Sequence, residues 1–274
     1  MRRVYNQSMM KLLYEGEKMK DEKNQTEKEN ALSAAGIPFV VSDELYGRTR
    51  KIMWSMVRYK ELQMQYVCAI KEVRTKFEVL NTEFNVREKR NPISSISARL
   101  KSTESVLKKM QARGLPPTLD DLEKNIFDMA GVRVVCSYID DIYKIAEAFL
   151  SQDDIRLIRR KDYIKNPKPN GYRSLHLIVS VPVFFSEQTK NIPVEVQIRT
   201  IAMDFWASLE HQIKYKKEIP EQERIVEQLR ECAEIITRTD EEMLSLRRRI
   251  ESAEDIPSEE EELLDKFKKI DVRM

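Results

Sequence analysis

One segment of the chain combines an aromatic side chain with several phosphate-binding residue types. The segment covers residues 170–176 and contains Tyr172 and His176. A loop that contains Lys168 comes directly before it. A tyrosine between a loop and a strand can stack on a planar base, and Lys168, Arg173 and His176 can donate hydrogen bonds to phosphate. The segment therefore predicts a nucleotide site. A core tyrosine beside a structural histidine is the alternative.

A second candidate is a strand whose polar residues alternate with apolar ones. Over residues 192–199, Glu195, Gln197 and Arg199 share one face, and valines and an isoleucine share the other. A carboxylate there could hold Mg²⁺ and activate a hydroxyl. A half-buried strand with a hydrated polar face would show the same alternation. Asp204 follows, at the start of the next predicted helix.

A third candidate joins a carboxylate, a tight turn and an arginine. Asp128 precedes Gly131, and Arg133 opens a strand that is predicted to be buried. Because a buried arginine needs an anionic partner, two interpretations are open. Asp128 and Arg133 form an ion pair, or Asp128 binds a metal beside an arginine that clamps phosphate or stacks on a base.

The fourth candidate is a basic helix face. Arg99 and Lys101 fall within a helix predicted over residues 93–112, and Ser105 and Lys109 follow Lys101 one and two turns later. Such a face can hold a polyphosphate through charge-assisted hydrogen bonds. A basic face on a helix is more often only solvated.

Composition excludes several classes of protein. The net charge of +2 argues against a general polyanion binder. Three widely spaced cysteines argue against a disulfide framework and fit a reducing compartment. With only two histidines, neither a His-Asp phosphohydrolase centre nor a three-histidine zinc site can be assembled. The first residues lack an apolar signal segment, and no apolar stretch could span a bilayer. We therefore predict a soluble, cytoplasmic protein.

Hydrophobic periodicity predicts helices around a mixed sheet, which is an α+β fold. Helices are expected at residues 42–84, 93–112, 119–129, 141–150 and 202–216. Asp140 and Asp141 are expected to cap the fourth of these helices. Strands are expected at residues 132–138, 155–163, 174–185 and 192–199.

The chain is predicted to have four segments. They are a polar, mobile extension at residues 1–40, the catalytic domain at 41–219, a C-terminal helix at 220–256 and an acidic tail at 257–274. The C-terminal helix carries a heptad seam, which either packs on the domain itself or contacts another subunit. The seam comprises Ile225, Leu229, Cys232, Ile236, Thr239, Met243, Leu246 and Ile250.

At these motifs the chain closely resembles the synthetase domain of the RelA/SpoT family. The similarity covers residues 128–136, 160–164, 170–176, 194–200 and 203–211. Small single-domain alarmone synthetases, the RelP type above all, resemble it most. The resemblance implies a mixed five-stranded sheet with a nucleotidyltransferase-like cleft, a homotetramer, and transfer of pyrophosphate from ATP to the ribose 3′-hydroxyl of GDP, GTP or GMP. It implies synthesis without hydrolysis, and no need for nucleic acid or a membrane.

The resemblance also assigns roles to individual residues. Asp128 and Glu195 match the Mg²⁺ ligands, with Glu195 also activating the 3′-hydroxyl and Arg133 assisting catalysis. The ATP contacts are Arg99, Lys101, Ser105, Lys109 and Arg133. The contacts to GDP or GTP are Lys161, Lys168, Tyr172, His176, Gln197 and Asp204. Tyr172 would stack on guanine, and the Asp204 carboxylate would accept two guanine N–H groups.

Three other functions are consistent with the residues alone. A non-catalytic nucleotide sensor could use the same fold, but it has little need for two metal-binding carboxylates. A helical RNA-binding protein would show a steep salt dependence and no need for ATP. A different nucleotidyltransferase would release pyrophosphate in place of AMP.

Overall fold

The computed structural model describes residues 43–88, 90–215 and 222–254. The chain divides into two units, Met1–Val57 and Arg58–Met274, and the sheet belongs to the second. The predicted mobile extension and the predicted acidic tail lie outside the described residues. Within the described ranges, no helix is both long enough and apolar enough to cross a membrane.

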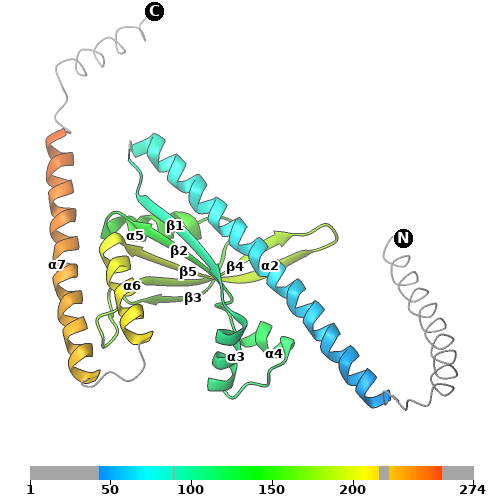
Figure 1. Ribbon diagram of the computed structural model, residues 1–274. Helices are drawn as coiled ribbons and strands as arrows, with labels where there is room; N and C mark the ends of the chain where they lie inside the picture. The colour runs from blue at the N-terminus through cyan, green and yellow to red at the C-terminus, as the bar shows by residue number, and fades with distance from the viewer. Residues whose placement is uncertain (1–42, 89, 216–221, 255–274) are drawn as a thin grey trace, which may run out of the picture. The chain divides into compact units, whose positions relative to one another are not determined.

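A mixed five-stranded sheet is the centre of the second unit (Figure 1). The strand order is β1-β2-β5-β4-β3, and β2 runs parallel to β5 while the other neighbouring pairs are antiparallel. The strands are β1 (Ile93–Leu100), β2 (Ala130–Cys136), β3 (Arg156–Asp162), β4 (Leu175–Phe184) and β5 (Thr189–Thr200). The predicted α+β class and mixed five-stranded sheet are confirmed.

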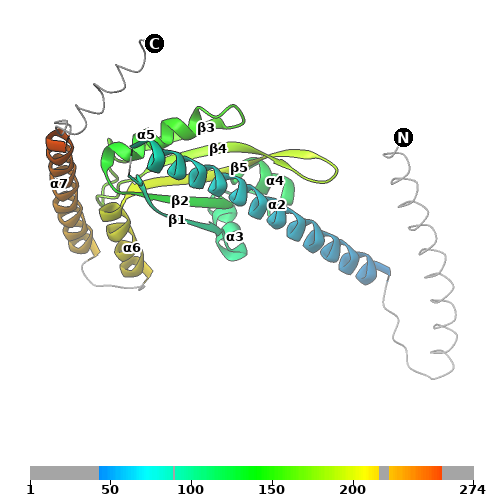
Figure 2. The same ribbon diagram turned by 90° about the horizontal axis from the view of Figure 1, so that it is seen from above.

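Six described helices accompany the sheet. They are α2 (Asp43–Glu88), α3 (Thr103–Ala112), α4 (Leu119–Asn125), α5 (Ile139–Leu150), α6 (Ile201–Tyr215) and α7 (Gln222–Glu254). Two views show α6 and α7 side by side (Figures 1 and 2). The long first helix is confirmed, and α4 ends four residues earlier than predicted.

The core is built from alternate strand residues and from one face of α2. On α2, Tyr66, Val73 and Phe77 are buried, as its periodicity predicts. Phe77 stacks on Phe149 of α5, with ring centroids 4.4 Å apart. Every second residue of β2, β4 and β5 joins the same core. The intervening residues of these strands are thereby directed to the opposite face of the sheet.

The helix predicted over residues 93–112 is wrong in its first half. Residues 93–100 form the edge strand β1, and α3 begins only at Thr103. Ser102 marks this start, because its side-chain oxygen accepts a hydrogen bond from the Ser105 backbone N at 3.3 Å. Isoleucine and serine are weak helix formers, and pairing with β2 decides the outcome. Arg99 and Lys101 therefore lie on β1 and directly after it, not on a helix.

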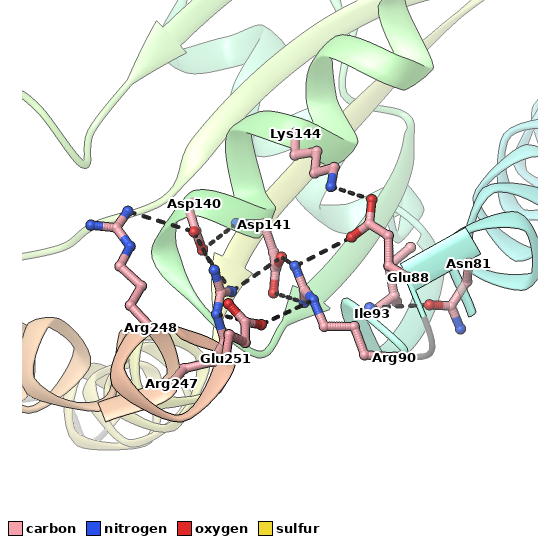
Figure 3. A network of polar contacts seen from close by, with 10 residues as sticks. All are labelled: Asn81, Glu88, Arg90, Ile93, Asp140, Asp141, Lys144, Arg247, Arg248 and Glu251. Atoms are coloured by element: carbon pink, nitrogen blue, oxygen red, sulfur yellow. Dashed lines mark hydrogen bonds and ion pairs between the residues drawn. The ribbon is translucent and has the colours of Figure 1, made fainter. Parts of the chain in front are cut away.

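The predicted capping of α5 by Asp140 and Asp141 is also wrong. Tyr138 occupies the N-cap position and makes no side-chain capping bond. The two aspartates lie in the first turn and bind arginines (Figure 3). Asp141 accepts hydrogen bonds from Arg90 at 2.5 and 2.9 Å, and Asp140 accepts two from Arg247 at 2.7 and 3.1 Å. This network joins α5 to α7 and to the segment before β1.

Replacing Asp141 with alanine should lower the free energy of unfolding by about 3 kcal/mol, because Arg90 would lose its buried anionic partner. The Asp141 side chain is 1% exposed and that of Arg90 is 24% exposed, so the expected loss is at the low end for a buried pair. Urea denaturation would measure it. Glu83, in an exposed pair with Arg87, provides the control Glu83→Ala, which should change little. Equal losses in both variants would contradict this account.

The helix α7 packs on the domain through a different face from the predicted seam. The residues of α7 that face the domain are spaced by seven and are buried or half-buried. They are Val226, Ala233, Asp240 and Arg247. Of the predicted seam, Ile225, Leu229 and Ile236 are half-buried, whereas Cys232, Thr239, Met243, Leu246 and Ile250 are exposed. From Thr239 onward the seam therefore does not pack on this domain.

Candidate active site

Polar side chains from three neighbouring strands gather on the face of the sheet opposite the core. The strand register places Arg133 of β2 opposite Gln197 of β5, and Gln197 opposite His176 of β4. Glu195 lies two residues before Gln197 and pairs with Gly131. Because the buried valines between them enter the core, these polar residues share the outer face. The alternation predicted for this strand is confirmed.

Glu195 is held from two sides. Its Oε2 accepts a hydrogen bond from Gln197 Nε2 at 3.0 Å, and its Oε1 lies 3.4 Å from His176 Nδ1. Gln197 Oε1 accepts in turn from Arg199 Nη2 at 2.6 Å. Burial raises the pKa of Glu195, but His176 and Gln197 outweigh burial and leave that pKa below its ordinary value. Glu195 is thus a carboxylate at neutral pH, suited to binding a cation or accepting a hydrogen bond.

Asp128 has one oxygen engaged and the other available. Its Oδ2 accepts hydrogen bonds from Lys101 Nζ and Lys109 Nζ, both at 2.6 Å. Its Oδ1 is buried and has no hydrogen-bond partner within the described chain. Burial raises the pKa of Asp128, but the two lysines more than offset it and lower the pKa overall. Asp128 therefore stays ionised and keeps one oxygen for a ligand.

The predicted alternative of an Asp128–Arg133 ion pair is wrong. Arg133 Nη1 lies 3.3 Å from Asp204 Oδ1, and Arg199 Nη1 lies 3.4 Å from the same oxygen. The Arg199 side chain is only 2% exposed, and burial lowers its pKa. One carboxylate thus offsets two arginines, which leaves this corner of the site positively charged.

Tyr172 connects the loop to the carboxylates. Its hydroxyl lies 2.8 Å from His176 Nε2, so Tyr172, His176 and Glu195 form one continuous chain of contacts. Lys168 Nζ lies 4.7 Å from the centroid of the Tyr172 ring and 4.8 Å from that of Tyr163. Burial raises the pKa of Tyr172, so its hydroxyl stays protonated and can donate.

Three adjoining cavities open on this face. The first, about 220 Å³, is lined by Arg99, Lys101, Asp128, Arg133, Glu195 and Gln197, among others. The second, about 720 Å³, is lined by residues that include Arg99, Arg133, Lys168, Tyr172, His176, Gln197 and Val226. The third, about 350 Å³, is lined by residues that include Lys109, Asp128, Lys161, Lys168, His176 and Glu195. Since each pair of cavities shares residues, the three meet around Glu195 and its neighbours.

The structure brings nearly all of the predicted site residues together. Each of them lines one of these cavities, except Ser105, Arg173 and Asp204. Ser105 lies in the first turn of α3, where its Oγ accepts a hydrogen bond from Ser102 Oγ at 2.8 Å. Asp204 lies between Arg133 and Arg199, next to the first two cavities.

Three basic residues that line the third cavity were not predicted from the sequence. Arg113, Lys124 and Arg159 line it with the predicted lysines, and among the described residues its acidic lining consists of Asp128 and Glu195. Arg159 belongs to a strand with interleaved basic residues, which was the one available signal. Arg113 and Lys124 stand in no recognisable motif, because only the packing of α3 and α4 brings them here. The excess of positive charge suits a polyphosphate.

The oxygen donors fit a hard divalent cation. Asp128 Oδ1 is buried and has no hydrogen-bond partner among the described residues, and Glu195 lines the same first cavity. Mg²⁺ is usually bound by one or two carboxylates together with substrate phosphates and water. In the parts of the chain that the structure describes, no group of three or more His, Cys, Asp or Glu could hold a metal. A cation here would therefore depend on the nucleotide for further ligands.

Known proteins are similar to this chain both in sequence and in fold. A family model described as the region found in RelA/SpoT proteins matches residues 98–220. GTP pyrophosphokinase YwaC of Bacillus subtilis is 41% identical over 198 residues, which are 72% of this chain and 93% of that protein. This chain belongs to the RelA/SpoT family. GTP pyrophosphokinase YjbM of the same organism is 32% identical to this family member, over 72% of this chain and 92% of that protein.

Solved structures place this RelA/SpoT-family chain among the small alarmone synthetases. Small alarmone synthetase 2 from Bacillus subtilis matches with a TM-score of 0.63 and 41% identity, over 70% of this chain and 98% of that one. Small alarmone synthetase 1 from the same organism, bound to its product pppGpp, matches with a TM-score of 0.65 and 33% identity, over 71% and 98%. The resemblance predicted from the motifs is confirmed.

Proposed function

We propose that this enzyme transfers the β,γ-pyrophosphate of ATP to the ribose 3′-hydroxyl of GDP or GTP, with release of AMP. The observation that carries the proposal is that Glu195 and Asp128 line both the first and the third cavity, while Gln197 and His176, which contact Glu195, line the second. Two nucleotides and their phosphates need that arrangement. Small alarmone synthetase 1 has been solved with pppGpp and with AMPCPP, an ATP analogue, which supports both substrates.

Each substrate is assigned to a cavity. ATP occupies the first, where Arg99 and Arg133 flank the base and Lys101 contacts its phosphates. Ser105 and Lys109, which shares Asp128 with Lys101 but lines the third cavity, would contact the same phosphates. The guanine of the acceptor occupies the second, stacked on Tyr172 and recognised by Gln197 and Asp204. The acceptor's 5′-phosphates extend into the third, toward Lys161, Lys168 and His176. The basic lining of the third cavity supports an acceptor with several phosphates, so GMP should be the weakest of the three acceptors.

Asp128 and Glu195 would hold the Mg²⁺ ion, which supplies Lewis-acid stabilisation of charge on the phosphates when bound. The ionised Glu195 accepts the hydrogen bond of the 3′-hydroxyl and takes its proton as the bond from the 3′-oxygen to the β-phosphorus forms. The bond between the β-phosphorus and the α,β-bridging oxygen breaks, and AMP leaves. Lys101, Lys109 and Arg133 neutralise the charge that develops, so positioning and electrostatics carry the reaction.

Replacing Tyr172 with alanine should raise the KM for GDP, by the roughly 1–3 kcal/mol that stacking of a base on an aromatic ring contributes. The KM for ATP should change little, because Tyr172 lines the second cavity and not the first. Steady-state kinetics with each nucleotide varied in turn would measure both. Tyr172→Phe, which keeps the ring, should retain most of the GDP affinity. A rise confined to ATP would show that the two pockets are assigned the wrong way round.

We also infer a homotetramer in the cytoplasm. Large apolar side chains are exposed on neighbouring helices, including Phe205 and Leu209 of α6 and Met243, Leu246 and Ile250 of α7. A second copy of the chain, bearing the same faces, would bury them. Cys68, Cys136 and Cys232 are all free thiols, which supports a reducing compartment. This chain makes the alarmone and does not hydrolyse it, since His176 belongs to the synthetase site and one other histidine remains.

The proposed reaction can be tested by nucleotide chromatography after incubation of the purified protein with Mg²⁺ and ATP. AMP should appear only when GDP or GTP is also present, in equal amount to a new guanosine tetra- or pentaphosphate. Release of pyrophosphate would indicate a different nucleotidyltransferase. Tight binding of GDP without any turnover would indicate a nucleotide sensor.

A further inference from the structure

We propose that α7 is a positioning element for the acceptor pocket, and that Ala233 and Asp240 are its positioning residues. The inference rests on the proposed function, because it concerns the pocket assigned to GDP or GTP. Three contacts join α7 to the parts of the chain that form this pocket, and a fourth anchors α7 to α5. The side chains of α7 that take part belong to its buried face, and Leu229 of the predicted seam contributes its backbone oxygen.

The first contact joins α7 to the loop that carries Tyr172. Gly171 has a φ of +88°, and a β-carbon built on it would lie 2.5 Å from the Ala233 Cβ and 3.2 Å from the Arg230 Cα. Glycine is therefore required here both by its backbone conformation and by the close approach of the helix. The backbone at Gly171, directly before Tyr172, therefore rests on α7. A shift of α7 by a few tenths of an ångström has to move the loop as well, because the contact leaves no space between them.

The second contact joins α7 to the start of α6. Thr200 Oγ1 donates a hydrogen bond to Asp240 Oδ2 at 2.6 Å and accepts one from the Met203 backbone N at 3.1 Å. Thr200 is fully buried and Asp240 is 7% exposed. Burial raises the pKa of Asp240, and the hydrogen bond from Thr200 opposes that rise. Asp240 thus orients the residue that caps α6, four positions before Asp204.

The third contact places an aromatic residue of α6 beside Tyr172. Trp206 Nε1 donates a hydrogen bond to the backbone oxygen of Leu229 in α7 at 2.9 Å. The Trp206 ring is 5% exposed, and its centroid lies 6.4 Å from that of Tyr172. In addition, Val226 of α7 lines the second cavity itself. The wall of the acceptor pocket is therefore continuous with α7.

The fourth contact fixes the far end of the helix. Arg247 binds Asp140 of α5 and lies over the ring of Tyr138, with its guanidinium carbon 4.7 Å from the centroid (Figure 3 shows the polar contacts). Asp140 belongs to α5, which packs on the sheet. The stretch of α7 that contacts the pocket is therefore held at one end by the contacts of Leu229 and Ala233 and at the other end by Arg247. None of the α7 residues named in these four contacts lines the first cavity. A displacement of α7 should therefore weaken acceptor binding and spare ATP binding.

The test compares binding of GDP and of AMPCPP, each measured by titration calorimetry. In Ala233→Val, the larger side chain presses on Gly171, and the dissociation constant for GDP should rise roughly tenfold or more, the scale expected for sub-ångström misplacement of a binding loop. The constant for AMPCPP should stay within about twofold, since a change at a distant independent site adds little. Ser245→Val makes a similar change at an exposed position of the same helix, and it should alter neither constant.

A second pair of variants distinguishes a loss of positioning from unfolding of the protein. Asp240→Ala removes the acceptor for Thr200 and should weaken GDP binding, whereas Asp240→Asn keeps a carbonyl oxygen there and should restore most of it. Equal weakening for GDP and AMPCPP, or unchanged GDP binding in both Ala233→Val and Asp240→Ala, would overturn the proposal. Binding does not depend on turnover. A wild-type protein that binds both nucleotides without reacting would therefore contradict the proposed reaction alone.

Discussion

Replacing Glu195 with glutamine should lower kcat by on the order of a hundredfold or more, the scale of a lost general base. Glu195 lines the first and third cavities, and its oxygens contact Gln197 and His176, which line the second. A neutral amide of the same size can fill the space, but it can neither take the proton of the 3′-hydroxyl nor bind Mg²⁺ as a carboxylate does. Single-turnover kinetics at saturating ATP and GDP would measure the loss.

Two controls make the Glu195→Gln result specific. The unfolding midpoint should stay close to that of the wild type, because the amide is isosteric with the carboxyl group. The dissociation constant for GDP should change much less than kcat, since guanine stacks in the second cavity, which Glu195 does not line. A rate equal to that of the wild type would remove Glu195 from the mechanism.

Asp128→Asn should also reduce kcat by on the order of a hundredfold, because a catalytic metal contributes several kcal/mol of charge stabilisation. The Mg²⁺ concentration for half-maximal rate should rise as well. Asp128 Oδ1 is the buried oxygen without a partner, and Oδ2 offsets the charges of Lys101 and Lys109. The asparagine loses both functions, since its amide is a poor metal ligand and carries no charge.

The dependence of the Asp128→Asn rate on Mg²⁺ separates the two roles. Recovery at high Mg²⁺ would indicate that metal binding is the main loss. Asp154→Asn is a matched control, because Asp154 also binds a lysine, Lys76, but neither residue lines any of the three cavities, and the rate of this variant should equal that of the wild type. An unchanged Mg²⁺ requirement in Asp128→Asn would contradict the assignment of Asp128 as a metal ligand.

The parts of the site that lie within one short motif were predictable from the sequence. Tyr172 and His176 are four residues apart in the chain and 2.8 Å apart at their polar atoms. Glu195 and Gln197 follow from strand alternation, which depends only on the period of the backbone. Local geometry sets these distances, so the sequence is sufficient to infer them.

The residues that depend on packing between distant segments were not predictable. Lys109 of α3 reaches Asp128 only because the strand β1 ends at Leu100 and the chain turns into α3. The sequence does not predict this turn, because the hydrophobic residues of 93–112 fit the periodicity of a single helix. Whether they form a strand is decided by the availability of β2 as a partner, which is a tertiary effect.

The face by which α7 packs was also misjudged, for a different reason. Hydrophobic periodicity selected a seam through Met243 and Leu246, but the face toward the domain is one residue away and contains Asp240 and Arg247. Both are charged, so a hydrophobic pattern passes over them. Their burial is compensated by Thr200 and Asp140, which lie far away in the sequence.

The most direct test of the central claim follows the fate of the γ-phosphorus of ATP. With ATP labelled at that atom, the label should appear in the guanosine product, attached through its 3′-pyrophosphate, and AMP should form in equal amount. Both the β- and the γ-phosphorus would then have moved together. Label in free phosphate or in free pyrophosphate, with none in the guanosine nucleotide, would contradict pyrophosphate transfer by this site.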